Sequence, residues 1–367
     1  MLPNKITLPM TSDTKNKGNN RDEKYMFRCI QLGKSALGTA APNPMVGCVI
    51  VHNDTIIGEG YTSPYGGPHA EANAIASVQD TSLLSEATLY VTLEPCAHFG
   101  KTPPCADLIL KHTIPEVVIG LQDPHEKVAG NGVRKLRDAG CRVTTGVLEQ
   151  ECRQLHKRFL TFHEQKRPFI ILKWAESGDG FMAPESKHRT QNREPFWITN
   201  RLSRQLVHKW RSEEQAILAG TNTVVRDNPK LNTREWHGKS PIRVVLDKDL
   251  RIRRDSNVYD GSGKTIVITE VRGQKEQPKT CYEVITFTKK LGKQICEILF
   301  KHQLQSVIVE GGAQTLSTFI EEDLWDEARI FTGNVFLHKG LRAPEITGSV
   351  SRSLLIEGNR LNLITHG

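Results

Sequence analysis

Short apolar runs alternate with amphipathic stretches along most of the chain. Val46–Val51 and Thr88–Leu93 are apolar enough to be buried strands, and the apolar spacing from Asp22 to Leu37 is typical of a helix. Strands that alternate with helices indicate an α/β domain with its sheet in the middle. In this first half the predicted helices cover residues 22–37, 69–76, 106–111 and 133–139, and the predicted strands cover 46–51, 56–57, 88–93, 117–120 and 142–144.

A helical connector over residues 149–162 leads to Lys166-Arg167-Pro168, and the strand–helix pattern then starts again. The two halves share this architecture but no motif, so the sequence predicts two fused α/β domains. We place a disordered tail at 1–20, the first domain at 21–165 and the second at 166–367. In the second half the predicted strands cover residues 169–175, 216–220, 242–246, 265–269 and 307–309, and the predicted helices cover 291–301 and 314–320.

Composition bounds the class of protein. The 367 residues are 38% hydrophobic and 25% charged, as in ordinary globular proteins, and no apolar run approaches the roughly 18–20 residues of a membrane span. The first 20 residues lack the apolar segment of a secretory signal. Of the eight cysteines, six are expected to be reduced and mostly buried, which predicts a cytoplasmic protein; they are Cys29, Cys48, Cys141, Cys152, Cys281 and Cys296.

The net charge of +8 does not by itself indicate nucleic acid as a partner. The basic residues are scattered, and no Lys/Arg run interleaved with aromatic residues occurs. Positive charge of this size equally suits a phosphorylated small molecule. Charge alone does not decide the partner; together with the resemblance described below, we expect a small-molecule substrate, with no nucleic acid and no membrane as partner.

The strongest chemical signal is His69-Ala70-Glu71, followed by Pro95-Cys96 and Cys105. One His and two Cys supply three Zn²⁺ ligands and leave the fourth tetrahedral position open, as in catalytic zinc sites. Such a zinc lowers the pKa of its bound water, and Glu71 is placed to take the proton. The alternative is a structural zinc whose fourth ligand is His98 or His112. The nine-residue step from Cys96 to Cys105 is longer than in most zinc-dependent base deaminases.

Signals in the second half are weaker. Glu310-Gly311-Gly312-Ala313 follows an apolar strand and opens a helix, where backbone N–H groups can approach a phosphate, although such a turn is more often only a tight connection. It is not the Gly-x-Gly-x-x-Gly dinucleotide fingerprint. Glu310 at the strand end needs a partner. Arg211, Arg226 and Arg234 are candidate phosphate ligands, with a solvated surface charge as the alternative for each.

These motifs resemble the bifunctional riboflavin-biosynthesis deaminase/reductase family over nearly the whole chain. The first half is similar through Pro42–Gly47, His69-Ala70-Glu71 and the long segment Leu93–Cys105. The second half is similar through residues 173–175, 197–199, 223–229 and 309–312.

The resemblance implies a cytidine-deaminase-like three-layer domain followed by a dihydrofolate-reductase-like α/β domain. It also implies two steps: deamination of 2,5-diamino-6-(5-phosphoribosylamino)pyrimidin-4-one, then NADPH reduction of the ribosyl group of the resulting uracil to ribityl. By position, His69, Cys96 and Cys105 would hold one zinc, with Glu71 as proton shuttle. NADPH would contact Ala175, Trp197, Thr223, Asp227, Gly312, Ala313, Gln314 and Thr315, and substrate would contact Arg211, Leu231, Arg234 and Glu310.

Two positions depart from the family pattern. Pro195 stands where the family commonly has Ser, which removes a substrate contact, and Ser177-Gly178-Asp179-Gly180 replaces Ser-Leu-Asp-Gly, which predicts a looser loop and an altered cofactor affinity. Two other functions stay open from the residues alone: a nucleic-acid deaminase whose second half binds the polynucleotide, and a zinc-stabilised interaction module. We expect the enzyme to be a homo-oligomer.

Overall fold

The computed structural model describes residues 17–99, 103–124, 130–185, 196–288 and 290–366. The chain divides into two compact units: Met1–Ala36 with Pro44–His156, and Leu37–Asn43 with Lys157–Gly367. The division falls inside the helix that connects them, α5 (Glu149–Gln165), whereas our sequence boundary follows this helix. Of the expected tail, residues 1–16 lie outside the described residues, and the last four begin helix α1.

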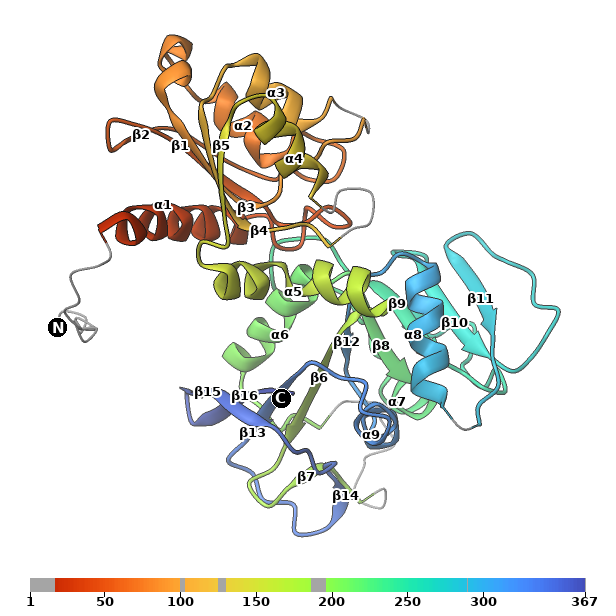
Figure 1. The fold of residues 1–367 in the computed structure, drawn as a ribbon. Coiled ribbons are helices and arrows are strands. Elements are labelled where there is room, and N and C mark those ends of the chain that lie inside the picture. Colours follow the sequence, from red (N-terminus) through yellow and green to blue (C-terminus); the bar gives the residue numbers. More distant parts are fainter. Residues whose placement is uncertain (1–16, 100–102, 125–129, 186–195, 289, 367) are drawn as a thin grey trace. The chain divides into compact units, whose positions relative to one another are not determined.

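The first unit is a five-stranded mixed sheet in the order β2-β1-β3-β4-β5, with β2-β1-β3 antiparallel and β3-β4-β5 parallel. Helices cover both of its faces (Figure 1). The strands are β1 (Gly47–His52), β2 (Thr55–Tyr61), β3 (Thr88–Leu93), β4 (Glu116–Leu121) and β5 (Arg142–Thr145). The helices are α1 (Lys17–Lys34), α2 (Ala70–Ala76), the 3-10 helix η1 (Thr81–Glu86), α3 (Cys105–Lys111) and α4 (Asn131–Asp138).

Two glycines set the distances between these layers. A Cβ on Gly47 of β1 would lie 1.9 Å from the carbonyl oxygen of Cys29 in α1, and a Cβ on Gly60 of β2 would lie 2.4 Å from the nitrogen of Ala74 in α2. Gly60 pairs with Cys48, the residue after Gly47, so the two glycines face opposite sides of the sheet. Helices α1 and α2 therefore pack on opposite faces, which confirms the three-layer prediction.

The second unit is built on a nine-stranded sheet in the order β11-β10-β9-β8-β12-β6-β13-β16-β15. The strands from β11 to β13 run parallel, and β16 and β15 add antiparallel strands at one end. A separate pair joins β14 to β7. The strands are β6 (Phe169–Glu176), β7 (Phe181–Pro184), β8 (Ala216–Gly220), β9 (Ile242–Leu246), β10 (Thr265–Thr269), β11 (Thr280–Val284), β12 (Ser306–Val309), β13 (Glu327–Thr332), β14 (Gly340–Arg342), β15 (Ser349–Ile356) and β16 (Asn359–Thr365).

Alternate residues of the central strands serve separate cores. Ile170 and Leu172 of β6 pack in one core with the helices α8 and α9, while Phe169 and Ile171 pack in another with α6. This two-sided burial explains why the parallel strands are continuous apolar runs. The helices are α6 (Arg201–Glu213), α7 (Thr221–Asp227), the 3-10 helix η3 (Asn257–Tyr259), α8 (Leu291–Lys301) and α9 (Ala313–Glu321).

The expected α/β class is confirmed for both units. Strand β3 and helix α8 have the predicted bounds, and the helix predicted at 314–320 is α9. Sequence analysis missed α6, α7, β7, β11 and the strands from β13 to β16. Within the described residues, every helix is too short or too polar to span a lipid bilayer.

Candidate functional site

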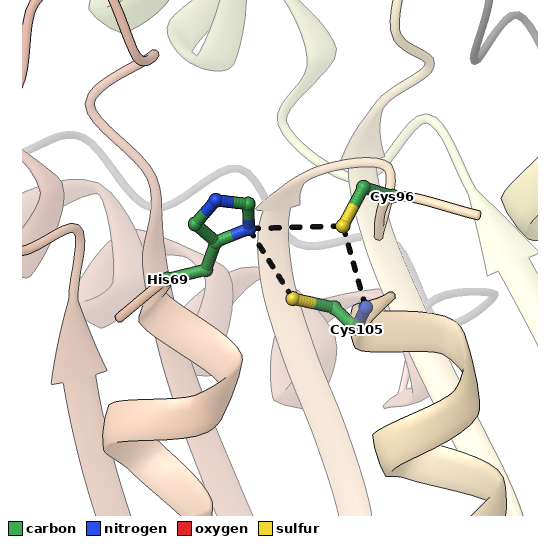
Figure 2. A group of neighbouring side chains, drawn as sticks. All are labelled: His69, Cys96 and Cys105. Carbon is green, nitrogen blue, oxygen red and sulfur yellow. Dashed lines mark hydrogen bonds between the residues drawn. The ribbon is translucent and has the colours of Figure 1, made fainter. Parts of the chain in front are cut away.

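The candidate zinc ligands converge in the first unit from three different segments (Figure 2). His69 is the residue just before α2, Cys96 follows the end of β3, and Cys105 is the first residue of α3. His69 Nδ1 lies 3.4 Å from Cys105 Sγ and 3.7 Å from Cys96 Sγ, and the three ligand atoms lie within 4.8 Å of one another. In a tetrahedral site with ordinary Zn–N and Zn–S bonds, ligand atoms are about 3.5–3.8 Å apart. The donor set therefore fits one Zn²⁺.

The fourth-ligand alternative has no support among the residues that the structure describes. The group of potential ligands there contains His69, Cys96 and Cys105, and neither His98 nor His112 joins it. A three-ligand site leaves one coordination position for water or substrate. The geometry thus favours a catalytic zinc over a structural one.

Glu71 lies in the first turn of α2 and is only 4% exposed. Burial, together with the nearby Cys96 sulfur, raises the pKa of its carboxyl group to about 7. A carboxyl group with such a pKa can both accept and donate a proton near neutral pH. The positive charge of a bound Zn²⁺ would lower this pKa again.

The two cysteines are electrostatically linked. The hydrogen bond from the Cys105 side chain lowers the pKa of the Cys96 thiol, and the same contact raises that of Cys105. The backbone N–H of Cys105 also donates to Cys96 Sγ at 3.3 Å. Cys96 is therefore poised as the first thiolate of the site. All eight cysteines are free thiols, and of the six outside the site all but Cys281 are buried.

A cavity of about 960 Å³ lies in the second unit, at the carboxyl ends of the parallel strands β6, β8, β9 and β12. Open α/β sheets bind ligands at this edge. Every candidate cofactor, substrate and phosphate-binding residue of the second half lines it: Ala175, Trp197, Arg211, Thr223, Arg226, Asp227, Leu231, Arg234, Glu310, Gly312, Ala313, Gln314 and Thr315.

The Gly-Gly turn lies where the sequence analysis expects it. Strand β12 ends at Val309, and Gly312 is the residue before α9. The N–H of Gly220, at the end of β8, donates to Gly311 O at 3.1 Å, and a Cβ on Gly220 would lie 2.6 Å from Thr315 Oγ1. Small residues thus let the start of α9 lie directly against the end of β8.

A buried charge cluster forms one wall of the cavity. Arg211 donates to both oxygens of Glu310, and Lys173 Nζ lies 3.7 Å from Glu310 Oε2. Burial alone would raise the pKa of Glu310, but Arg211 and Lys173 lower it to about 2. Burial, Arg211 and Arg234 lower the pKa of His208 to about 4. At neutral pH the wall therefore carries an ionised carboxylate and a neutral imidazole.

Sequence analysis missed several polar residues of this cavity. Lys173 had a usable signal, because it is a charged residue in the middle of the apolar run of β6. Arg204, His208, Lys248 and Arg251 also line the cavity, and no local motif marks them.

The two departures from the family pattern have different outcomes. Pro195 lies outside the described residues. The turn at Gly178 is not loose: Ser177 Oγ donates to Asp179, whose carboxylate accepts the N–H groups of Leu337 and His338. A Cβ on Gly178 would lie 3.0 Å from the Phe336 ring, so that ring fills the space beside it. The expected loosening is wrong; the effect on cofactor affinity stays a prediction.

Comparison with known proteins identifies each half of the chain. Residues 19–121 match the cytidine and deoxycytidylate deaminase zinc-binding region, and residues 168–359 match the RibD C-terminal domain. The chain is 37% identical to riboflavin biosynthesis protein RibD of Aquifex aeolicus, over 93% of this chain and 95% of the relative. It is 33% identical to that of Escherichia coli, over 91% and 90%.

Solved structures show the same relationship. A diaminohydroxyphosphoribosylaminopyrimidine deaminase/5-amino-6-(5-phosphoribosylamino)uracil reductase from Thermotoga maritima matches with a TM-score of 0.84 and 35% identity, over 95% of this chain and 99% of that one. RibD of Acinetobacter baumannii matches with a TM-score of 0.85 and 32% identity, over 95% and 100%. The chain therefore belongs to the RibD family and is a bifunctional deaminase and reductase of riboflavin biosynthesis, with zinc and NADPH as its cofactors.

Proposed function

We propose that the first unit deaminates 2,5-diamino-6-(5-phosphoribosylamino)pyrimidin-4-one and that the second unit reduces 5-amino-6-(5-phosphoribosylamino)uracil with NADPH. The observation that carries the proposal is the convergence of His69, Cys96 and Cys105 beside the buried Glu71. The relative from Thermotoga maritima, which carries both activities, supports the choice of substrates.

In the deaminase, His69, Cys96 and Cys105 would hold the zinc. When bound, Zn²⁺ supplies the positive charge that makes water nucleophilic near neutral pH. As the oxygen of the attacking water bonds to the amino-bearing ring carbon, the Glu71 carboxylate accepts a proton from that water. Glu71 then donates this proton to the departing nitrogen, which leaves as ammonia when the C–N bond breaks.

In the reductase, NADPH would lie along Ala175, Trp197, Thr223, Asp227 and the stretch Gly312–Thr315. The start of α9 suits a phosphate, because the first N–H groups of a helix have no partner within it. Arg211, Leu231, Arg234 and Glu310 would hold the phosphoribosyl substrate.

When bound, NADPH supplies the hydride, and the residues of the cavity hold the sugar against it. Lys173, whose ammonium group is buried beside the Glu310 carboxylate, is placed to give a proton to the ring oxygen of the sugar as the ring opens.

We also propose that the protein is cytoplasmic and forms a homo-oligomer. Within each chain, the proposed domain boundary follows α5. Free thiols support a reducing compartment. The edge strand β15 exposes Val350 and Leu355, by 59% and 76%, which suits a contact with a second copy. Light scattering of the purified chain tests the oligomer, and a monomer at micromolar concentration would contradict it.

One experiment tests the two activities. The chain is incubated with the diaminopyrimidine phosphate, with and without NADPH, and the products are analysed. We expect ammonia and the aminouracil without NADPH, and the ribityl product when NADPH is present. Release of ammonia from single-stranded RNA or DNA but not from the pyrimidine would contradict the proposal.

A further inference from the structure

Glu94 is a buried carboxylate that accepts four backbone N–H groups. It is only 4% exposed and lies directly after β3. Its Oε1 accepts from Gly132 at 2.8 Å and Val133 at 3.1 Å, and its Oε2 accepts from Gly130 at 3.0 Å and Asp123 at 3.2 Å. A carboxylate has about four acceptor sites. The four bonds therefore occupy all acceptor sites of Glu94, and they tie the end of β3 to the start of α4.

The same stretch of chain carries a zinc ligand two residues later. A Cβ on Gly132 would lie 2.1 Å from Pro95 O, so the first turn of α4 can lie against the Pro95 carbonyl only with glycine at this position. On the other side, Cys96 O accepts the N–H of Ala106, and Cys96 Sγ accepts that of Cys105 (Figure 2). Cys96 is thus held between the start of α4 and the start of α3.

We propose that Glu94 is a positioning residue of the zinc site, which fixes Cys96 Sγ where it can share one metal ion with His69 and Cys105. It acts through the backbone, since its two oxygens are occupied by N–H groups and it does not belong to the group of potential ligands. Residues that orient metal ligands typically contribute 10–100-fold to metal affinity. This inference rests on the zinc site of the proposed function.

The test is Glu94→Gln, which keeps the size of the side chain. Whichever way the new amide turns, its NH₂ group faces two N–H donors that Glu94 now satisfies. We expect zinc affinity of the full chain, measured by competition with a chromophoric chelator, to fall about 10–100-fold. The thiolate and d–d absorption bands of the protein saturated with Co²⁺ should also change.

Gly132→Ala is a second variant, which leaves Glu94 in place but displaces Pro95, and it should weaken zinc binding in the same way. Leu84→Ala is the matched control, because Leu84 is fully buried in η1 and has no contact with Glu94 among the bonds described above. It should lower the free energy of unfolding of the unit yet keep the wild-type zinc affinity and cobalt spectrum.

Two results would overturn the inference. The first is a Glu94→Gln protein with wild-type zinc affinity and cobalt spectrum. The second is a Leu84→Ala protein that loses as much affinity as Glu94→Gln at equal stability, since general destabilisation would then explain both. A wild-type chain that binds no zinc would contradict the proposed function itself, so the two failures are distinguishable.

Discussion

Arg211 and Glu310 form a two-point ion pair inside the cavity of the second unit. Arg211 Nε lies 2.8 Å from Glu310 Oε1, its second terminal nitrogen lies 2.7 Å from Oε2, and its first donates to Asn232 O. Three of the five N–H donors of this guanidinium are therefore engaged within the protein. A substrate phosphate would have to bind the remaining donors or take the place of Glu310.

The ion pair predicts a coupling between the two residues. Removal of one partner of a buried pair leaves an uncompensated charge and typically costs about 3–5 kcal/mol. Lys173 beside Glu310 should lower the cost of losing Arg211 and raise the cost of losing Glu310. Urea unfolding of Arg211→Met, Glu310→Gln and the double variant should give a coupling free energy of about 1–3 kcal/mol between the two residues. If the two single changes in the free energy of unfolding simply add up in the double variant, the pair does not stabilise the unit.

Zinc content tests the ligand assignment. Cys105→Ser replaces a thiolate by a hydroxyl group, which is a poor zinc ligand, so we expect the zinc bound per chain to fall sharply from one and deamination to be lost. The matched control is Cys281→Ser, a half-buried thiol of β11 in the second unit, which should keep its zinc. Full metal content in Cys105→Ser measured by atomic absorption would refute the assignment.

Buried His156 predicts an acid-sensitive first unit. Its Nε2 lies 3.1 Å from Thr92 Oγ1, its Nδ1 has no hydrogen-bond partner among the described residues, and burial lowers its pKa to about 3. Between its unfolded pKa of 6.5 and this value the unfolded chain binds more protons than the folded chain. The contribution of neutral His156 to the free energy of unfolding is therefore complete above pH 6.5, and it is lost as the pH falls toward 3.

The variant His156→Gln removes this titration. The wild-type free energy of unfolding should fall by about 1–2 kcal/mol more than that of the variant between pH 7 and pH 5, because one pKa unit corresponds to about 1.4 kcal/mol. Chemical denaturation at the two pH values measures this difference. Parallel losses in the two proteins would show that His156 does not titrate in this way.

The sequence predicted the zinc site well because its chemistry needs rare residue types in a fixed order. The cavity of the second unit was harder to predict. Lys173 and Glu310 are far apart in the sequence and meet because β12 pairs with β6, while His208 lines the same cavity from α6. Strand β13 was missed because it carries Glu327 and Arg329, which are buried yet paired with each other, and such charges hide an apolar pattern.

The central claim is that the two activities belong to two sites, one at Glu71 and one at Glu310. The most direct measurement assays Glu71→Gln for ammonia release and, separately, for NADPH oxidation with the deaminated substrate supplied. Because Glu71→Gln keeps the zinc ligands and removes only the proton carrier, deamination should fall about 10²–10⁴-fold while reduction stays near wild type. Glu310→Gln should show the reverse. A folded, zinc-loaded Glu71→Gln protein that has lost both activities would contradict the account.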